Sequence, residues 1–160
     1  MAVDITLNLN LSTTSIMIRT INSYIEVGFV KVGTMTKNVS LGKKKHNVYV
    51  DYIDYEPKGK KGVYIIAYGD TVKKIGESEN LHHRFQCYES HSGSTNTSIR
   101  ESMVEHKFYD IYFIECPHYT VGFAGVLVDS GISYKTVEKQ LLRQYKELTG
   151  NVPVWNKGIQ

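Results

Sequence analysis

The chain has 160 residues and a net charge of +3, and 41% of its residues are hydrophobic. This length and composition predict one folded domain with a buried core and exclude a disordered polypeptide. No apolar run approaches the roughly 20 residues of a membrane-spanning helix, and the first residues lack the pattern of a signal peptide, so we expect a cytoplasmic protein.

The first 57 residues are predicted to form an N-terminal extension. Residues 4–10 and 47–55 alternate apolar and polar side chains, which is the pattern of half-buried strands. Residues 13–32 have a helical pattern over part of their length, although β-branched residues and glycine weaken it. This part of the sequence therefore predicts two strands and one partly helical segment.

Residues 58–160 are predicted to form the core. Two β-rich runs, 62–68 and 71–76, are separated only by Gly69 and Asp70, which is a hairpin pattern. The order predicts an α/β (α+β) fold with a small, mainly antiparallel three-stranded sheet flanked by helices. The elements after the hairpin are expected to be a helix capped by Ser78 or Asn80, a loop at 91–97, a helix at 97–106, a strand at 108–115, an irregular segment or small hairpin at 118–132, and a helix at 134–148.

The helix after the hairpin carries the first candidate site residues. Arg84 and Tyr88 are spaced i, i+4 and share one side of a helix, as Leu81 and Arg84 do at i, i+3. An arginine among aromatic side chains on a half-buried surface is costly unless an anion meets it. The alternative is a surface arginine over a tyrosine ring, and the helix spacing alone favours that alternative.

The last helix carries a carboxylate beside its apolar stripe. Glu138 adjoins the stripe, so it either pairs with a basic group, binds a cation or is a simple boundary residue. The stripe consists of Val137, Leu141, Tyr145 and Leu148.

Other chemistries lack their motifs. The sequence has no phosphate-binding GxxxxGK[ST] loop, no GxGxxG after a strand and no GxSxG elbow. His82 and His83 are adjacent, so they cannot point the same way from a helix as a metal-binding pair would. Cys87 and Cys116 form no CxxC motif, and we expect both to be reduced.

Taken together, the candidate residues resemble the GIY-YIG nuclease family over about residues 60–157. Residues 62–64 (GVY) resemble its first motif and residues 74–76 (KIG) its second, ten residues later from Tyr64 to Lys74. Most of the family has tyrosine where this chain has Lys74, but a branch of type II restriction endonucleases carries KIG there. The remaining matches are Leu81 and Arg84 of a Leu-x-x-Arg motif, Tyr88, Glu138 and Asn156.

The resemblance implies a DNA endonuclease that uses one Mg²⁺ (or Mn²⁺) ion per active site, bound by Glu138. It implies that Arg84 binds the scissile phosphate and that Tyr64 takes the proton from the attacking water. A free phenol has a pKa near 10, so we expect the Lys74 ammonium to favour the phenolate. Tyr88 would orient the water or a phosphate oxygen. Asn156 would brace the site from the tail.

The expected partner is double-stranded DNA, cut by a homodimer with two active sites. Phosphate contacts are predicted for two lysine clusters, although solvated loops are the alternative. Sequence readout is predicted for the loop 91–97, the insertion 117–133 and the N-terminal part. The predicted DNA-binding residues are Lys43, Lys44, Lys45, Lys58, Lys60, Lys61, His91, Ser94, Thr95 and Asn96.

Two points stay open at the level of sequence, the functional class and the role of Glu77. The enzyme could be a type II restriction endonuclease or a phage or mobile-element endonuclease with relaxed specificity, and a non-catalytic nucleic-acid-binding module is a third alternative. Glu77 follows the second motif and could pair with Lys74 or Arg84, or face solvent.

Overall fold

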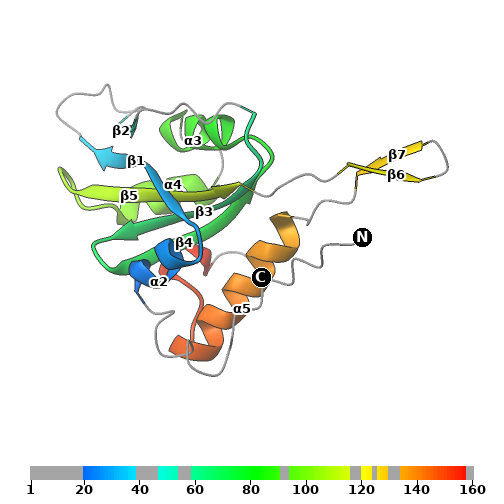
Figure 1. Cartoon of the computed structure of the whole chain (residues 1–160). Coiled ribbons are helices and arrows are strands. Elements are labelled where there is room, and N and C mark those ends of the chain that lie inside the picture. Colours follow the sequence, from blue (N-terminus) through cyan, green and yellow to red (C-terminus); the bar gives the residue numbers. More distant parts are fainter. Residues whose placement is uncertain are drawn as a thin grey trace.

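A computed structural model describes residues 20–38, 47–53, 59–90, 94–115, 120–123, 126–129 and 134–157 (Figure 1). The strand predicted at residues 4–10 lies outside the described residues. The elements in chain order are α2 (Ile21–Glu26), β1 (Val30–Lys37), β2 (Val48–Tyr52), β3 (Gly62–Tyr68), β4 (Thr71–Ser78), α3 (Leu81–Ser90), α4 (Ser94–Ser102), β5 (Phe108–Glu115), β6 (Thr120–Phe123), β7 (Val126–Asp129), α5 (Tyr134–Thr149) and the 3₁₀ helix η1 (Val154–Asn156).

The central sheet is antiparallel and has five strands in the order β2-β1-β5-β3-β4. The predicted antiparallel sheet flanked by helices is confirmed, but it has five strands rather than three. The two additional strands, β1 and β2, lie in the segment predicted to be an extension. β1 pairs with β5 from Val30 to Thr36, so the sheet runs across the expected boundary at residue 57.

The helical pattern at residues 13–32 is only partly correct. In the described part of that segment, α2 ends at Glu26 and β1 begins at Val30. A β-branched stretch gains more from pairing with β5 than from continuing the helix, because strand formation depends on the neighbouring strand as much as on local propensity.

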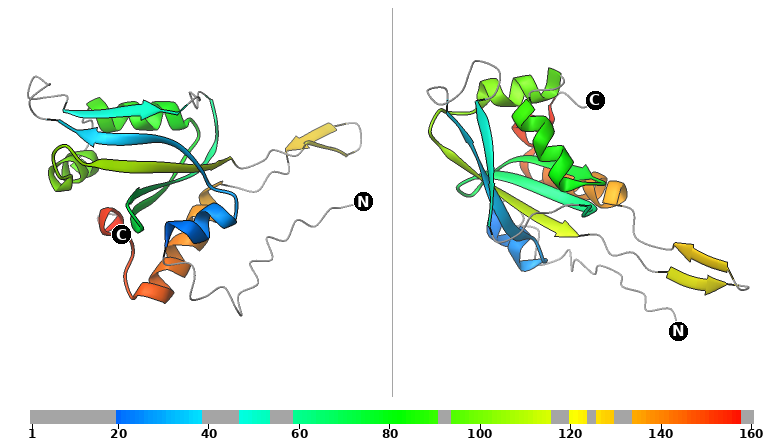
Figure 2. Two further views of the ribbon diagram at one scale, coloured as in Figure 1. Left: turned by 60° about the vertical axis from the view of Figure 1, so that its left-hand side comes forward. Right: turned by 90° about the horizontal axis from the view of Figure 1, so that it is seen from above.

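Helices cover both faces of the sheet (Figures 1 and 2). α3, α4 and η1 pack on one face through a cluster that includes Tyr64, Phe85 and Trp155. α2 and α5 pack on the other face through a cluster that includes Tyr24 and Leu141. We call these the α3 face and the α5 face. Because β4 is an edge strand, the two faces meet beside it.

Gly62 begins β3 where β5 comes closest. A Cβ atom at this position would lie 2.0 Å from the carbonyl oxygen of Ile114 and 2.8 Å from the ring of Phe113. No side chain fits at these distances, so glycine at the start of the first motif is required by the contact between β3 and β5.

The segment between β5 and α5 contains a two-stranded antiparallel hairpin, β6–β7, which projects from the rest of the structure (Figure 1). Of the two alternatives predicted for 118–132, an irregular segment or a small hairpin, the structure has the hairpin. No helix in the described part of the chain is long and apolar enough to cross a membrane.

Candidate active site

Three of the predicted catalytic side chains meet on the α3 face. Tyr64 is fully buried in β3, and its Oη lies 2.8 Å from the Oη of Tyr88. The Nε of Arg84 donates a hydrogen bond to the same Tyr64 Oη at 3.1 Å. The Arg84 guanidinium also lies over the Tyr88 ring, 5.1 Å from its centroid. The arginine is therefore held in place by two tyrosines, one from β3 and one from α3.

The N-terminal cap of helix α3 determines where Arg84 and Tyr88 lie along the helix. The side-chain oxygen of Asn80 accepts a hydrogen bond from the backbone N–H of His83 at 3.3 Å, as an N-terminal cap does. Arg84 and Tyr88 follow one turn apart and face the sheet side of the helix. The cap thus sets the start of the helix so that Arg84, in its first turn, contacts Tyr64.

Gly76 in β4 makes room for the Tyr64 ring. A Cβ atom at this glycine would lie 2.4 Å from both Cζ and Oη of Tyr64. The two residues are direct partners in the β3–β4 ladder. The glycine of the second motif is therefore needed because the phenol of the first motif lies against it.

Lys74 reaches the α3 face through a β-bulge. Ile66 pairs with Lys74 but Ala67 pairs with Val72, so β4 has one extra residue at this point. In a regular strand Val72 and Lys74 would share a face. With the bulge, Val72 packs in the core of the α5 face, whereas Lys74 pairs with a residue of the opposite core. Bulges of this kind commonly re-aim a side chain beside an active site.

The Lys74 ammonium is almost completely buried, with 1% of the residue exposed. Its Nζ donates a hydrogen bond to the backbone carbonyl of Trp155 at 3.4 Å. Burial and the positive charge of Arg84 lower the pKa of Lys74 to about 8, and the carboxylate of Glu138 acts in the opposite direction. Lys74 therefore lies within the electrostatic reach of both Arg84 and Glu138.

Asn156 attaches the C-terminal η1 helix to the edge strand. Its side-chain oxygen accepts a hydrogen bond from the Ile75 backbone N–H at 3.0 Å, and its amide nitrogen donates one to the Ile75 carbonyl at 2.7 Å. Asn156 is 3% exposed. These two bonds fix Trp155 and its carbonyl beside Lys74, which is the geometry that a bracing residue needs.

Glu138 lies on α5, at the edge where the two faces meet. It is half-buried, and burial and the negative charge of Glu77 raise the pKa of its carboxyl group, while Lys74, Lys139 and Arg84 lower it. Glu77 is half-buried in β4 and pairs in the ladder with Val63 of the α5 face. The structure therefore places Glu77 near Glu138.

The position of α5 is held at its first residue. Tyr134 Oη donates a hydrogen bond to Glu79 Oε1 at 2.7 Å, which links α5 to the turn between β4 and α3. This bond raises the pKa of Tyr134 to about 12. Glu138 is one helical turn beyond Tyr134, so the link fixes the part of α5 that carries the carboxylate.

The charges around Tyr64 differ from the arrangement expected from the sequence. Burial raises the pKa of Tyr64, and the charge of Arg84 and the hydrogen bond with Tyr88 oppose the rise. The cation in contact with the phenol is thus Arg84, whereas Lys74 is directed toward Trp155. Because its pKa is raised, Tyr64 is a neutral phenol at pH 7.

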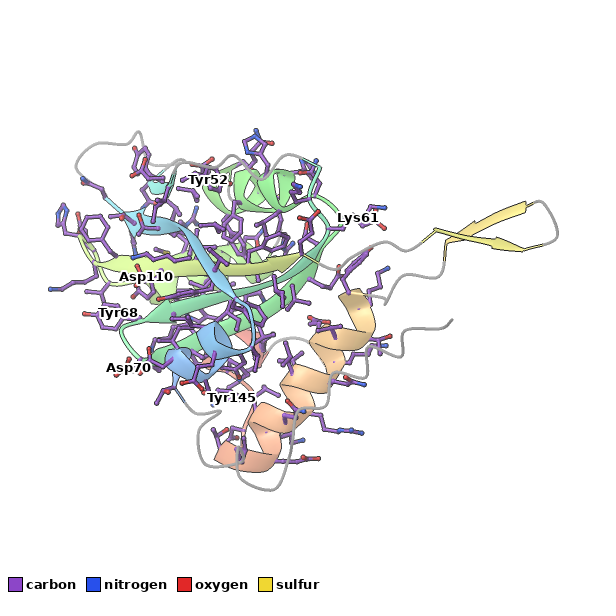
Figure 3. All side chains as sticks on the ribbon, in the orientation of Figure 1. Tyr52, Lys61, Tyr68, Asp70, Asp110 and Tyr145 are labelled. Atoms are coloured by element: carbon purple, nitrogen blue, oxygen red, sulfur yellow. The ribbon has the colours of Figure 1, made fainter. Side chains whose placement is uncertain are left out.

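The structure describes five of the ten predicted DNA-binding residues. Asn96 is 6% exposed and donates a hydrogen bond to the Cys87 carbonyl at 3.4 Å, so it packs α4 on α3 instead of facing a ligand. Ser94 and Thr95 belong to the first turn of α4 rather than to a loop. Lys60 pairs with Glu115 at 3.3 Å. Exposed Lys61 lies at the end of the sheet where β3 begins (Figure 3). The others, Lys43, Lys44, Lys45, Lys58 and His91, lie outside the described residues.

The donor chemistry at the edge of β4 fits a single hard cation. Glu138 is accessible enough to reach an ion, and the nearby Glu77 adds negative charge. Mg²⁺ prefers oxygen donors and retains several water ligands, so one protein carboxylate is enough. No group of three or more His, Cys, Asp or Glu side chains among the described residues is arranged to hold a metal ion.

The antiparallel sheet with helices on both faces is a fold found in solved nuclease structures. One is the restriction endonuclease HPY188I in complex with product DNA, which aligns with a TM-score of 0.55 and 17% identity over 84% of this chain and 84% of that chain. Another is a mutant of bacteriophage T4 EndoII, with a TM-score of 0.58 and 18% identity over 86% of this chain and 98% of that chain. Comparisons with protein-family models and with curated proteins give no match.

Two features of the site were not found from the sequence. The Trp155 carbonyl that accepts from Lys74 is a backbone group, and no residue pattern marks it. Phe85 is fully buried and contacts the Tyr64 ring edge-on, with 5.3 Å between ring centroids. The sequence did contain an indication of this packing. An apolar residue next to Arg84 predicts that this side of α3 packs on the sheet.

Proposed function

We propose that this protein is a Mg²⁺-dependent DNA endonuclease of the GIY-YIG family, in the branch with KIG as its second motif. The observation that carries this proposal is the direct contact of Tyr64, Arg84 and Tyr88 on one side of β4, with Glu138 on the other side. A phenol can accept a proton, a guanidinium can stabilise charge on a phosphate, and an accessible carboxylate can hold a metal ion, which are three contributions suited to hydrolysis of a phosphodiester.

In the proposed reaction Arg84 binds the scissile phosphate and stabilises the charge that develops on it. Tyr64 accepts the proton of the attacking water, and Tyr88 orients the water or a phosphate oxygen. Burial raises the pKa of Tyr64, and the Arg84 cation opposes this rise, so the same guanidinium favours the phenolate. The Lys74 ammonium lies within electrostatic reach of Arg84 and Glu138, and Asn156 holds the strand that carries it.

Glu138 would hold the Mg²⁺ (or Mn²⁺) ion, one per active site. Such an ion, when bound, polarises the phosphate and stabilises the leaving 3′ oxygen. The contribution of the chain is to keep one carboxylate accessible beside a fixed arginine and tyrosine. Glu77 lies close enough to add negative charge to the ion site.

We propose further that the enzyme is a type II restriction endonuclease acting as a homodimer in the cytoplasm, because a double-strand cut by one-site subunits needs two of them. The similarity to HPY188I, a restriction endonuclease, favours this biological role. The similarity to phage EndoII favours the second candidate, an endonuclease with relaxed specificity.

The proposal is tested by incubating purified protein with plasmid DNA and Mg²⁺, followed by sequencing of the cut ends. We expect cleavage that stops when EDTA is added. Discrete fragments with one end sequence support a restriction endonuclease, and a smear supports relaxed specificity. No cleavage in Mg²⁺ or Mn²⁺ would leave a non-catalytic binding module and contradict the proposal.

The metal assignment is tested with the substitution Glu138→Ala. We expect cleavage to be abolished while DNA binding remains within about threefold, because the carboxylate contacts the ion and not the DNA. Glu147→Ala, on the exposed side of the same helix, is the matched control and should cut normally. A Glu138→Ala protein that cuts at the normal rate in Mg²⁺ buffer would show that the ion is held elsewhere.

A further inference from the structure

The outer side of α5 carries a row of cations that the proposed chemistry does not use. α5 has 16 residues, and its inner side packs on the sheet through Leu141, with Val137 and Tyr145 against the same core. All four of its basic residues are exposed. These residues, which we call the α5 row, are Lys135, Lys139, Arg143 and Lys146.

The four cations lie on one side of the helix. With about 100° of rotation per residue, they fall within an arc of roughly 80°, next to the direction of Glu138. Neither acidic residue of α5 falls inside this arc, because Glu138 lies before it and Glu147 beyond it. With a rise of about 1.5 Å per residue, the row is roughly 16 Å long.

A solvated helix surface is the ordinary explanation for exposed lysines, but it predicts alternating charges. Such helices usually place a carboxylate four residues from each cation, and like charges at this spacing destabilise the helix. Here Lys135, Lys139 and Arg143 follow one another at i, i+4. Arg143 has a carboxylate nearby, Glu147, at the long distance of 3.8 Å. Lys135 and Lys139 are within electrostatic reach of Glu79 and Glu138 respectively, but no acidic residue of α5 lies within the arc of the four cations. The row therefore presents a continuous line of positive charge that a polyanion can meet.

The row begins at the candidate active site. Lys135 and Lys139 lie on either side of Glu138 in the sequence, and the Tyr134–Glu79 hydrogen bond fixes this turn of α5 to β4. Lys61 is exposed at the nearby start of β3 (Figure 3). The charge of Lys61 and that of Lys135 both lower the pKa of the Glu79 carboxyl, although its hydrogen bond with Tyr134 lowers it most. Lys61 at the sheet edge and Lys135 on α5 are therefore both within electrostatic reach of the same carboxylate, Glu79.

We propose that the α5 row binds the phosphate backbone of duplex DNA that flanks the scissile phosphate. This inference rests on the proposed function. One strand of B-DNA places a phosphate about every 3.4 Å along the duplex axis, so a row of roughly 16 Å can follow about five of them. The contacts are independent of base sequence and hold the substrate while the loops select its sequence.

The inference is tested with the double variant Arg143→Gln/Lys146→Gln and the control Lys107→Gln, which neutralises an exposed lysine before β5. Binding of a fluorescent 30-base-pair duplex is measured in EDTA at several salt concentrations. Because each lost phosphate contact lowers the slope of log K against log salt by about 0.9, we expect a decrease of nearly two for the double variant. At about 100 mM salt its affinity should be roughly tenfold weaker, and Lys107→Gln should match the wild type.

Cleavage separates the two proposals. At saturating DNA in Mg²⁺ the double variant should cut within about twofold of the wild-type rate, because the row positions the duplex and does not touch the reacting atoms. An unchanged salt slope in the double variant, or an equal loss in Lys107→Gln, overturns the role of the row even if the wild type cuts DNA. A wild type that cuts no DNA overturns the proposed function whatever the slopes are.

Discussion

The two faces that meet at β4 differ in how firmly their functional side chains are held. On the α3 face, Tyr64 and Lys74 are buried and Tyr64 is hydrogen-bonded to Arg84. On the α5 face, Glu77 and Glu138 are half-exposed and carry like charges. The side chains proposed to act on the phosphate are therefore preorganised. The carboxylate proposed to bind the ion, by contrast, stays open to water and to ion exchange.

The edge position of β4 makes this pairing possible. In a central strand, side chains on opposite faces are separated by the neighbouring strands. At an edge, a helix on one face can bring its side chains around the strand. This is why the Glu138 carboxylate influences the pKa of Lys74, although Lys74 faces α3 and Glu138 lies on α5.

The largest effect on activity is expected from Tyr64→Phe, which alters one of the preorganised side chains of the α3 face. The ring and its contact with Phe85 are retained, but the oxygen that holds Arg84 and accepts the proton is lost. We expect the single-turnover cleavage rate to fall by about 10²–10⁴-fold. The control is Tyr68→Phe at the end of the same strand, where the residue is 41% exposed. Full activity of Tyr64→Phe would contradict the role of the phenol.

The buried charge of Lys74 gives a prediction for stability. Its pKa is about 8 when folded, which is below the unfolded value of 10.5, so folding disfavours the charged form. The penalty is fully present below pH 8 and is relieved as the pH rises toward 10.5. Relative to Lys74→Met, the wild type should gain about 2–3 kcal/mol in free energy of unfolding between pH 7.5 and 10. The measurement is urea unfolding at both pH values, and an equal difference at both would refute the lowered pKa.

A smaller effect is expected from Asn156→Ala. The substitution leaves the Ile75 N–H and carbonyl without their side-chain partner, which should cost about 1–3 kcal/mol in the free energy of unfolding. Cleavage should also slow, because the Trp155 carbonyl no longer stays beside Lys74. Asn151→Ala, on the exposed turn after α5, is the control for both measurements. Unchanged stability and rate would show that η1 does not brace the site.

Much of the core was predictable because its patterns are local. The β3–β4 hairpin, the β5 strand and helix α5 were expected nearly where they lie, since two-residue turns and helical stripes are short-range features. β1 was missed because its pairing with β5 depends on residues about 75 positions apart.

The site was predictable as a set of residues but not as an arrangement of charges. The spacing of Arg84 and Tyr88 fixed their common side of α3. It could not show that Arg84 rather than Lys74 would contact Tyr64, because that depends on a bulge in β4. Asn96 was predicted to lie in a loop, because polar residues in a Ser/Thr-rich segment favour turns. In the structure it belongs to α4 and packs this helix on α3.

The Asn156 side chain has a consequence for self-association. Edge strands expose unpaired backbone groups that can pair with another chain and seed aggregation. By bonding to both the N–H and the carbonyl of Ile75, one side-chain amide imitates the next strand of the sheet at the centre of β4. The contact that positions Lys74 thereby also blocks strand addition at the edge of the sheet that carries the candidate active site.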